Sequence, residues 1–186
     1  MNSLFNIIYI TWGLSEIFIS RFLRSKAGDK KNQDKNSLAV IWITIIIAIT
    51  LAIYISIHYY LPISASQTIR YYGLALIAAG IILRLIVIGS LGKYFTADVT
   101  IRQGHQLKKD SFYKYLRHPS YSASVLSFVG FGLSLNNWVS LILIVVAILF
   151  AFIRRINVEE KTLTKHFGQE YIAYKKSTYR LIPFIY

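Results

Sequence analysis

The chain has 186 residues, of which 55% are hydrophobic, and its mean hydropathy is +0.48. This composition is too apolar for an ordinary soluble domain, so it predicts an integral membrane protein. The chain contains no cysteine, which excludes disulfides, thiolate metal sites and a cysteine nucleophile. The formal net charge of +13 is compatible with a nucleic-acid-binding protein or a membrane protein, and the placement of the charges distinguishes them.

Three apolar runs, residues 4–22, 38–61 and 71–91, are long enough to cross a bilayer core of about 30 Å as helices. The first run lacks the basic segment and cleavage site of a signal peptide, so we expect it to remain as a helix. Two shorter runs, residues 121–135 and 139–153, predict a tight helical hairpin. The predicted fold class is an all-α membrane protein with five transmembrane helices.

Basic residues gather on one side of these runs. They fall within residues 21–35, 93–117 and 154–180, whereas the loops on the other side contain only Arg70. This is the positive-inside pattern, which predicts an N-terminus outside and a C-terminus in the cytoplasm. A nucleic-acid-binding face would concentrate its charges on one element of a soluble domain, so we expect no nucleic-acid partner.

Two charged residues, Glu16 and Arg84, lie inside the predicted spans. Each is about two turns from the predicted cytoplasmic end of its helix. Their equal depth predicts an intramembrane ion pair, because an isolated charge at that depth is costly. The alternative is that each side chain extends separately to the membrane interface.

The third run also contains Gly73, Gly80 and Gly89. Small residues allow helices in lipid to approach closely. We therefore expect this helix to be the packing centre of the bundle.

Two polar segments flank the hairpin. The first is Arg117-His118-Pro119-Ser120-Tyr121, and the second, residues 155–174, carries Glu159 and Glu160. A membrane hairpin would return both segments to the same face, so we expect them to build one site. Each also has a purely structural interpretation. A proline suits the first turn of a helix, and Arg155 and Glu159, four residues apart, suit a helical ion pair.

The second polar segment has the pattern of an amphipathic helix at or leaving the membrane interface. Its apolar residues recur at three-, four- and seven-residue steps from Ile156 to Tyr174. Gly168 is the expected break in this helix.

Other motifs carry less information. His105 and Asp110 fit the H-x4-D pattern of glycerolipid acyltransferases, but no glycine-rich phosphate motif accompanies them. The histidines lack a paired metal-ligand spacing, so no metal site is expected. The glycine signatures of dinucleotide-binding and P-loop proteins are absent.

Together the two polar segments resemble the isoprenylcysteine carboxyl methyltransferase family of integral membrane enzymes, which use S-adenosylmethionine. The resemblance covers about the C-terminal half of the chain, from residue 91 onward, and rests on the order and spacing of short matches. The matches before the hairpin are Gly104-His105, Leu107, Tyr113 and Arg117 to Tyr121. Those after it are Arg155, Glu159-Glu160, Leu163, Phe167-Gly168, Glu170-Tyr171, Tyr174-Lys175-Lys176 and Pro183-Phe184-Ile185. Lys108-Lys109, Ser111 and Ala123 depart from the family pattern and bear on the acceptor more than on the methyl donor.

The resemblance implies a cytoplasmic active site, with an S-adenosylmethionine pocket at the cytoplasmic face between the loop before the hairpin and the helix after it. The implied cofactor-binding residues are His105, Gln106, Leu107, Lys108, Tyr113, Arg117, His118, Pro119, Ser120, Tyr121, Glu159 and Glu160. Arg155 and Glu159 are the implied catalytic residues, with Arg155 facing the acceptor. Residues 1–91 would form an N-terminal three-helix transmembrane part, and residues 92–186 the catalytic part.

The implied function is methyl transfer to the carboxylate of a prenylcysteine-like lipidic acceptor, a small molecule or peptide that enters from the bilayer. A carboxylate needs no general base, so positioning does most of the work, and Arg155 can hold it by a bidentate pair. Membrane lipids are the other expected partners. A phospholipid amine acceptor would need a proton acceptor, with His105 or Glu160 as candidates. An H-x4-D acyltransferase and a non-enzymatic membrane scaffold are the remaining alternatives.

Overall fold

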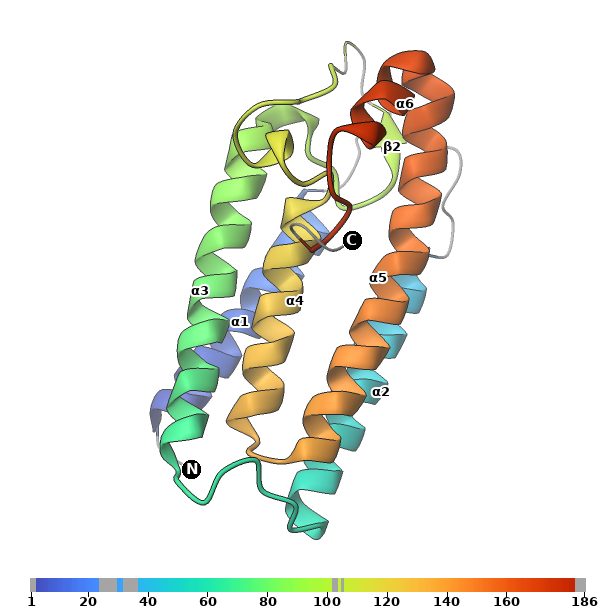
Figure 1. Ribbon diagram of the computed structural model, residues 1–186. Coiled ribbons are helices and arrows are strands. Elements are labelled where there is room, and N and C mark those ends of the chain that lie inside the picture. Colours follow the sequence, from blue (N-terminus) through green and yellow to red (C-terminus); the bar gives the residue numbers. More distant parts are fainter. Residues whose placement is uncertain (1–2, 24–29, 32–36, 102–103, 105, 183–186) are drawn as a thin grey trace.

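The computed structural model describes residues 3–23, 30–31, 37–101, 104 and 106–182. It is a bundle of long helices that is capped at one end by short helices and loops (Figure 1). The α-helices are α1 (Ser3–Phe22), α2 (Ser37–His58), α3 (Thr68–Leu91), α4 (Pro119–Ser134), α5 (Trp138–Phe167) and α6 (Gln169–Lys176). The remaining described elements are the 3-10 helices η1 (Gly92–Tyr94) and η2 (Ser111–Lys114) and an antiparallel pair of two-residue strands, β1 (Lys30–Lys31) and β2 (Thr100–Ile101).

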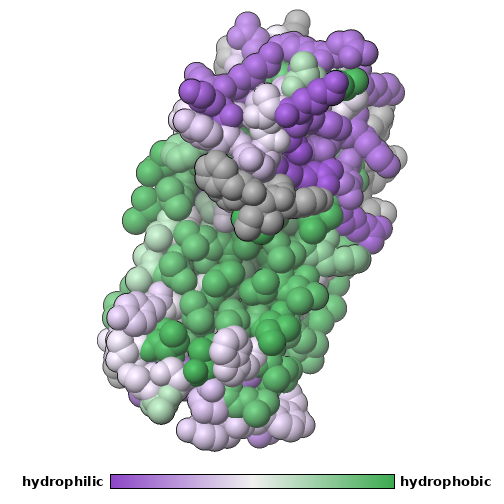
Figure 2. Space-filling model, viewed as in Figure 1, coloured by the Kyte–Doolittle hydropathy of each residue, from purple (hydrophilic) through white to green (hydrophobic). Residues whose placement is uncertain are grey.

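The long helices form a membrane bundle. By length and composition, α1, α2, α3 and α5 can each cross a membrane. Figure 2 shows a hydrophobic band over the long helices and a hydrophilic surface at the capped end, which we call the polar end. The chain is therefore an all-α, multi-pass integral membrane protein. At 1.5 Å per residue, the 16 residues of α4 span about 24 Å, so the fifth span remains a prediction.

Helix α4 packs against α3 and α5, and α2 packs against α5. Gly73 of α3 and Gly130 of α4 bring two backbones together: a Cβ on Gly73 would lie 2.5 Å from the Gly130 carbonyl oxygen. A Cβ on Gly80 would lie 2.8 Å from the carbonyl oxygen of Ala123 in α4. Close packing of α3 on α4 is thus confirmed at these two glycines, whereas its expected place as the packing centre of the whole bundle stays a prediction.

Gly89 does not take part in this packing. It is exposed, and a Cβ placed there would have no neighbour within 4 Å. Seven residues bring Gly80 nearly onto the same helical face as Gly73, whereas nine more turn Gly89 to about the opposite face. The expectation for Gly89 is therefore wrong because of the helical period.

The predicted hairpin turns at Asn136 and Asn137 and is held by their side chains. The Asn136 Oδ1 atom accepts hydrogen bonds from the backbone amides of Ile63 and Ser64, at 3.1 and 3.0 Å. Asn137 caps α5 by accepting a hydrogen bond from the backbone amide of Ser140 at 3.1 Å. The turn is therefore fastened to the chain that connects α2 and α3.

Beyond the hairpin, the arrangement differs from the sequence-based expectation of a helix beginning near Arg155. Helix α5 continues without a break from Trp138 to Phe167 because no proline or glycine interrupts it. The expected break at Gly168 is confirmed: its φ of +56° suits glycine, and α6 starts directly after it. One rigid helix thus carries both the apolar span and the charged residues beyond it.

Glu16 and Arg84 form the predicted intramembrane ion pair. The Arg84 Nη1 atom donates to Glu16 Oε1 at 2.7 Å, and both side chains are largely buried. Arg84 also donates to the hydroxyl of Ser124 in α4. The pair therefore connects α1, α3 and α4 near the polar end of the bundle.

The glycine contact predicts the effect of adding one methyl group. We expect Gly73→Ala to destabilise the detergent-purified protein by about 1–3 kcal/mol, because the methyl group would clash with the α4 backbone. Gly89→Ala in the same helix is the matched control and should leave the melting temperature unchanged or slightly raised. Equal melting temperatures for the two variants would contradict the close packing of α3 on α4.

The ion pair predicts non-additive mutational effects. In a double-mutant cycle of Glu16→Gln and Arg84→Gln, we expect a coupling energy of about 0.5–3 kcal/mol in the free energy of unfolding, because the residues share one contact. Reversible unfolding in detergent measures it. Additive losses would show that the two charges are stabilised separately.

Candidate active site

A cavity lies at the polar end of the bundle, where the helices meet the loop between α3 and α4. One wall is polar. It is formed by that loop, by the first turn of α4 and by the second half of α5. The other wall is apolar and includes Ile19 of α1 and Leu38, Ile41 and Ile45 of α2. A single cavity thus presents both polar groups and a hydrocarbon-like surface.

The cavity brings together most of the residues that the sequence implicated. Those on its wall are Leu107, Lys108, Tyr113, Arg117, His118, Pro119, Ser120, Tyr121, Arg155 and Glu159. Gln106 and Glu160 are described but do not line it, and His105 lies outside the described residues. The two polar segments that flank the hairpin therefore do meet at one place.

The segment before α4 is held by backbone pairing with the chain after α6. The backbone amides of Arg117 and His118 donate to the carbonyl oxygens of Tyr179 and Arg180, at 2.8 and 3.2 Å. Pro119 then starts α4, as its fixed φ allows. The Arg117 to Tyr121 motif is therefore a helix start and also part of the cavity wall.

A hydroxyl group connects the two predicted catalytic side chains. The Tyr121 hydroxyl donates to Glu159 Oε2 at 3.0 Å and accepts from Arg155 Nε at 3.3 Å. Because Arg155 and Glu159 are one turn apart on α5, a single tyrosine from α4 can reach both. The helical spacing of Arg155 and Glu159 thus serves a contact with a third residue, Tyr121, on another helix.

Arg155 is also held by partners that the sequence did not indicate. It is only 2% exposed. Its Nη2 atom donates to the Ala97 carbonyl oxygen at 2.8 Å, and its Nη1 atom donates to the Ser37 hydroxyl at the start of α2. These oxygen atoms hold both terminal nitrogens of the guanidinium in place.

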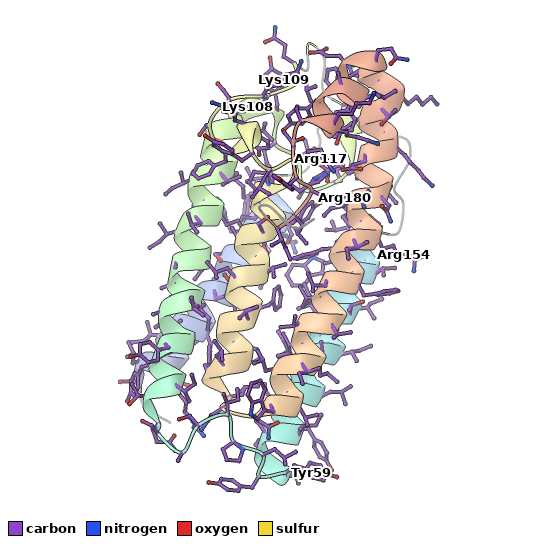
Figure 3. All side chains as sticks on the ribbon, viewed as in Figure 1. Tyr59, Lys108, Lys109, Arg117, Arg154 and Arg180 are labelled. Carbon is purple, nitrogen blue, oxygen red and sulfur yellow. The ribbon has the colours of Figure 1, made fainter. Side chains whose placement is uncertain are left out.

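His118 lies between the two glutamates. Its Nδ1 atom is 3.8 Å from Glu159 Oε2, and its Nε2 atom is 3.3 Å from Glu160 Oε1. Glu160 also accepts hydrogen bonds from Arg117 Nε at 2.9 Å and Arg180 Nη2 at 2.8 Å. Figure 3 shows Arg117 and Arg180 close together at the polar end. The position of Glu160 favours a structural role and does not favour contact with a cofactor.

Two buried tyrosines support the polar wall. The Tyr174 hydroxyl donates to the Tyr113 carbonyl oxygen at 2.6 Å, which fixes η2 against α6. Burial raises the pKa of Tyr174 to about 12. Burial and the nearby charge of Glu159 raise the pKa of Tyr113 above its ordinary value. Both hydroxyls are therefore protonated donors at neutral pH.

Several cavity residues were not predicted to belong to the site. Glu16 and Arg84 were expected to pair, and the structure also places both on the cavity wall. The apolar residues of α2 recur at three- and four-residue steps, but this pattern alone does not separate a cavity wall from a lipid-facing surface. All eight residues from Tyr94 to Ile101, in the loop after α3, also line the cavity.

The described half of the H-x4-D motif, Asp110, is a surface residue. Asp110 is 76% exposed in its side chain and forms an ion pair with Lys108 at 2.7 Å. It does not line the cavity. This placement gives no support to the acyltransferase alternative.

The comparisons with known proteins agree with this arrangement. The model of the phospholipid methyltransferase family matches residues 69–170. A protein-S-isoprenylcysteine O-methyltransferase from Arabidopsis thaliana is 35% identical over 61% of this chain and 59% of its own length. A Saccharomyces cerevisiae protein of the same name is 36% identical over 61% of this chain and 48% of its own length.

A solved structure shares the fold. It is that of the eukaryotic intramembrane Ras methyltransferase ICMT, isoprenylcysteine carboxyl methyltransferase, with a TM-score of 0.66 and 23% identity. The match covers 98% of this chain and 64% of that one, so the chain spans less than two thirds of the length of these relatives. Since the family model matches more than half of the sequence, the chain belongs to the phospholipid methyltransferase family, and its curated relatives are the isoprenylcysteine carboxyl methyltransferases that its polar segments resemble.

Proposed function

We propose that this protein is a membrane methyltransferase that transfers a methyl group from S-adenosylmethionine to the carboxylate of a prenylcysteine-like lipidic acceptor. The observation that carries the proposal is the Arg155–Tyr121–Glu159 connection inside a cavity with one polar and one apolar wall. The names of the curated relatives support a methyltransferase with such an acceptor.

The polar wall has side chains that suit the cofactor. Glu159 lies on the wall with its side chain 30% exposed, so it can accept hydrogen bonds from an amino group or ribose hydroxyls. The rings of Tyr113 and Tyr121 can pack against a purine or face a positively charged sulfonium. S-adenosylmethionine, when bound, supplies an electrophilic methyl group. The predicted contacts of His105 and Gln106 would extend this set, and Glu160 would act by holding Arg117 and His118.

Arg155 is the group we assign to the acceptor. A guanidinium binds a carboxylate by two parallel charge-assisted hydrogen bonds, which orient the attacking oxygen. Tyr121, Ser37 and Ala97 each accept from a different nitrogen of this guanidinium, so its orientation is fixed before the acceptor arrives. No proton has to be removed from an ionised carboxylate, and we therefore assign no general base.

The apolar wall is the proposed position of the lipid chain. Leu38, Ile41 and Ile45 of α2 and Ile19 of α1 line this side, where a prenyl group would be removed from water. The acceptor would enter from the bilayer with its carboxylate towards the polar end. We place that end in the cytoplasm and the N-terminus outside, and we take residues 92–186 as the catalytic part and residues 1–91 as the transmembrane part that completes the lipid wall.

A phospholipid amine is the alternative acceptor, and the name of the matching family supports it. The buried guanidinium of Arg155 favours the carboxylate instead, although the carboxylates Glu16, Asp98 and Glu159 also line the cavity. A protonated amine beside Arg155 would be repelled by it and would first have to lose a proton.

Site variants test the two assigned roles. We expect Glu159→Gln to weaken binding of S-adenosylhomocysteine at least tenfold, because a charged acceptor is lost. Arg155→Lys should leave that binding within twofold and lower kcat by about 10–100-fold, as expected for losing a charge-assisted pair of about 1.5–3 kcal/mol. Calorimetry and initial rates in nanodiscs measure the two effects.

The control for these variants is Glu170→Gln, which removes a surface carboxylate that pairs with Lys109 at 2.6 Å. This variant should change neither the binding of S-adenosylhomocysteine nor kcat. Unchanged melting temperatures of all three variants would show that any loss of binding or activity is not due to unfolding. The assignment fails if wild-type protein that is folded does not bind S-adenosylhomocysteine, or if Glu159→Gln and Glu170→Gln bind it equally.

The chemistry of the product identifies the acceptor. With S-adenosylmethionine carrying a tritiated methyl group, we expect incorporation into S-farnesylated N-acetylcysteine and release of the label as methanol by mild base, because a methyl ester is base-labile. Phosphatidylethanolamine should acquire no label. Label in base-stable phospholipid would instead establish the amine as the acceptor.

A further inference from the structure

A second hollow lies at the polar end, outside the active-site cavity and sharing no lining residue with it. It is a shallow groove between the end of α5 and the chain after α6. Its wall contains Lys161 and Lys165 of α5, Lys175 of α6 and Arg180, together with Asn157, Glu160 and Thr164. We call it the basic groove.

The basic groove carries an excess of positive charge. Glu160 is the one carboxylate among its described lining residues. That carboxylate is already bound by Arg180 at 2.8 Å and by Arg117 at 2.9 Å, and Lys175 Nζ is 3.9 Å away. Lys161 and Lys165 lie four residues apart on the same side of α5, where like charges repel each other. An anion between them would relieve this repulsion.

The position of the groove on α5 relates it to the membrane surface. Ile142, Val146 and Phe150 are exposed apolar residues at four-residue steps, as expected for contact with lipid. Arg154 continues this line and points away from the bundle (Figure 3). Lys161 is seven residues further, so it lies on nearly the same side of the helix and about 10 Å along its axis. The groove therefore stands directly beyond the lipid-facing surface.

The hydropathy of the surface agrees with this position. Figure 2 shows the hydrophobic band giving way to a hydrophilic surface over the end of α5 and α6. The polar headgroup layer occupies about 5–8 Å beyond each side of the hydrocarbon core. Basic side chains that project from just above this layer can contact the headgroups of adjacent lipids.

We propose that the basic groove binds the headgroup of an anionic phospholipid. Lys161, Lys165 and Lys175 would supply the charge, and Arg180 would form the side of the groove nearest to Glu160. The attraction of juxtamembrane lysines to anionic lipids is strong enough to select such a lipid over a zwitterionic one. The proposal concerns lipid binding alone and does not depend on methyl transfer.

The groove is connected to the active-site cavity by a short chain of contacts. Glu160 accepts from Arg180 and lies 3.3 Å from His118 Nε2, and His118 is on the cavity wall. The Arg180 carbonyl oxygen also accepts a hydrogen bond from the His118 backbone amide at 3.2 Å. A bound headgroup would thus stabilise the segment that positions His118.

The test is native mass spectrometry of delipidated protein with dioleoylphosphatidylserine or dioleoylphosphatidylcholine. We expect wild-type protein to retain the serine lipid about tenfold more strongly. The double variant K161Q/K165Q should lose this preference, whereas K161R/K165R should keep it. Retention of the full preference in K161Q/K165Q would overturn the proposal.

Matched controls separate a site from net charge. K109Q/K114Q removes the same number of charges from residues that do not line the basic groove and should keep the preference. An equal loss in this control would show that only total charge matters and would overturn the proposal. Displacement of the lipid by millimolar inorganic phosphate would also overturn it, because the groove would then be a site for free phosphate. Unchanged melting temperatures show that the variants are folded.

Discussion

The burial of the Arg155 guanidinium is the constraint on which the rest of the site depends. A charged group at that position is stable only when polar groups surround it, and α5 by itself offers few. The partners come from the start of α2, from the loop after α3 and from α4. Satisfying one arginine therefore brings four separate parts of the chain together, and the cavity is the space that they enclose.

Two other buried charge clusters fasten this arrangement. The Glu16–Arg84 pair ties α1 to α3 and α4 beside the cavity, and Glu160 ties α5 to the segments before α4 and after α6. Such clusters add little net stability, since desolvation offsets much of the attraction. Losing one partner is costly, however, so each cluster strongly favours the one arrangement in which all partners meet. A bundle whose helices otherwise present similar apolar surfaces gains a unique register in this way.

Features that depend on hydropathy and helical period could be predicted from the sequence. The long apolar runs predicted the long helices, and the two short apolar runs on either side of Asn136-Asn137 predicted the hairpin. The equal depth of Glu16 and Arg84 in their helices predicted their ion pair. The grouping of three glycines in α3 predicted close packing, but only Gly73 and Gly80, seven residues apart, share the face that contacts α4. The partners of Arg155 at Ser37 and Ala97 had no such signal, because a lone hydroxyl and a backbone carbonyl become ligands only through tertiary packing. Likewise, no local pattern distinguishes the α2 residues that line the cavity from those that face lipid.

The location of the cavity follows from the same logic. Glu159 and Arg155 are adjacent turns of one helix, yet Glu159 is partly exposed and Arg155 is almost fully buried. One turn of α5 thus carries a partly exposed carboxylate on the cavity wall and a guanidinium that is enclosed by protein. In the proposed function, the polar donor would lie against the first group and the acceptor carboxylate against the second, so their reacting atoms would meet between the two. Helix α5 runs unbroken through Phe167, so Arg155 and Glu159 are held about 6 Å apart along its axis, the rise of four helical residues. A hinge near Arg155 would have left this distance variable.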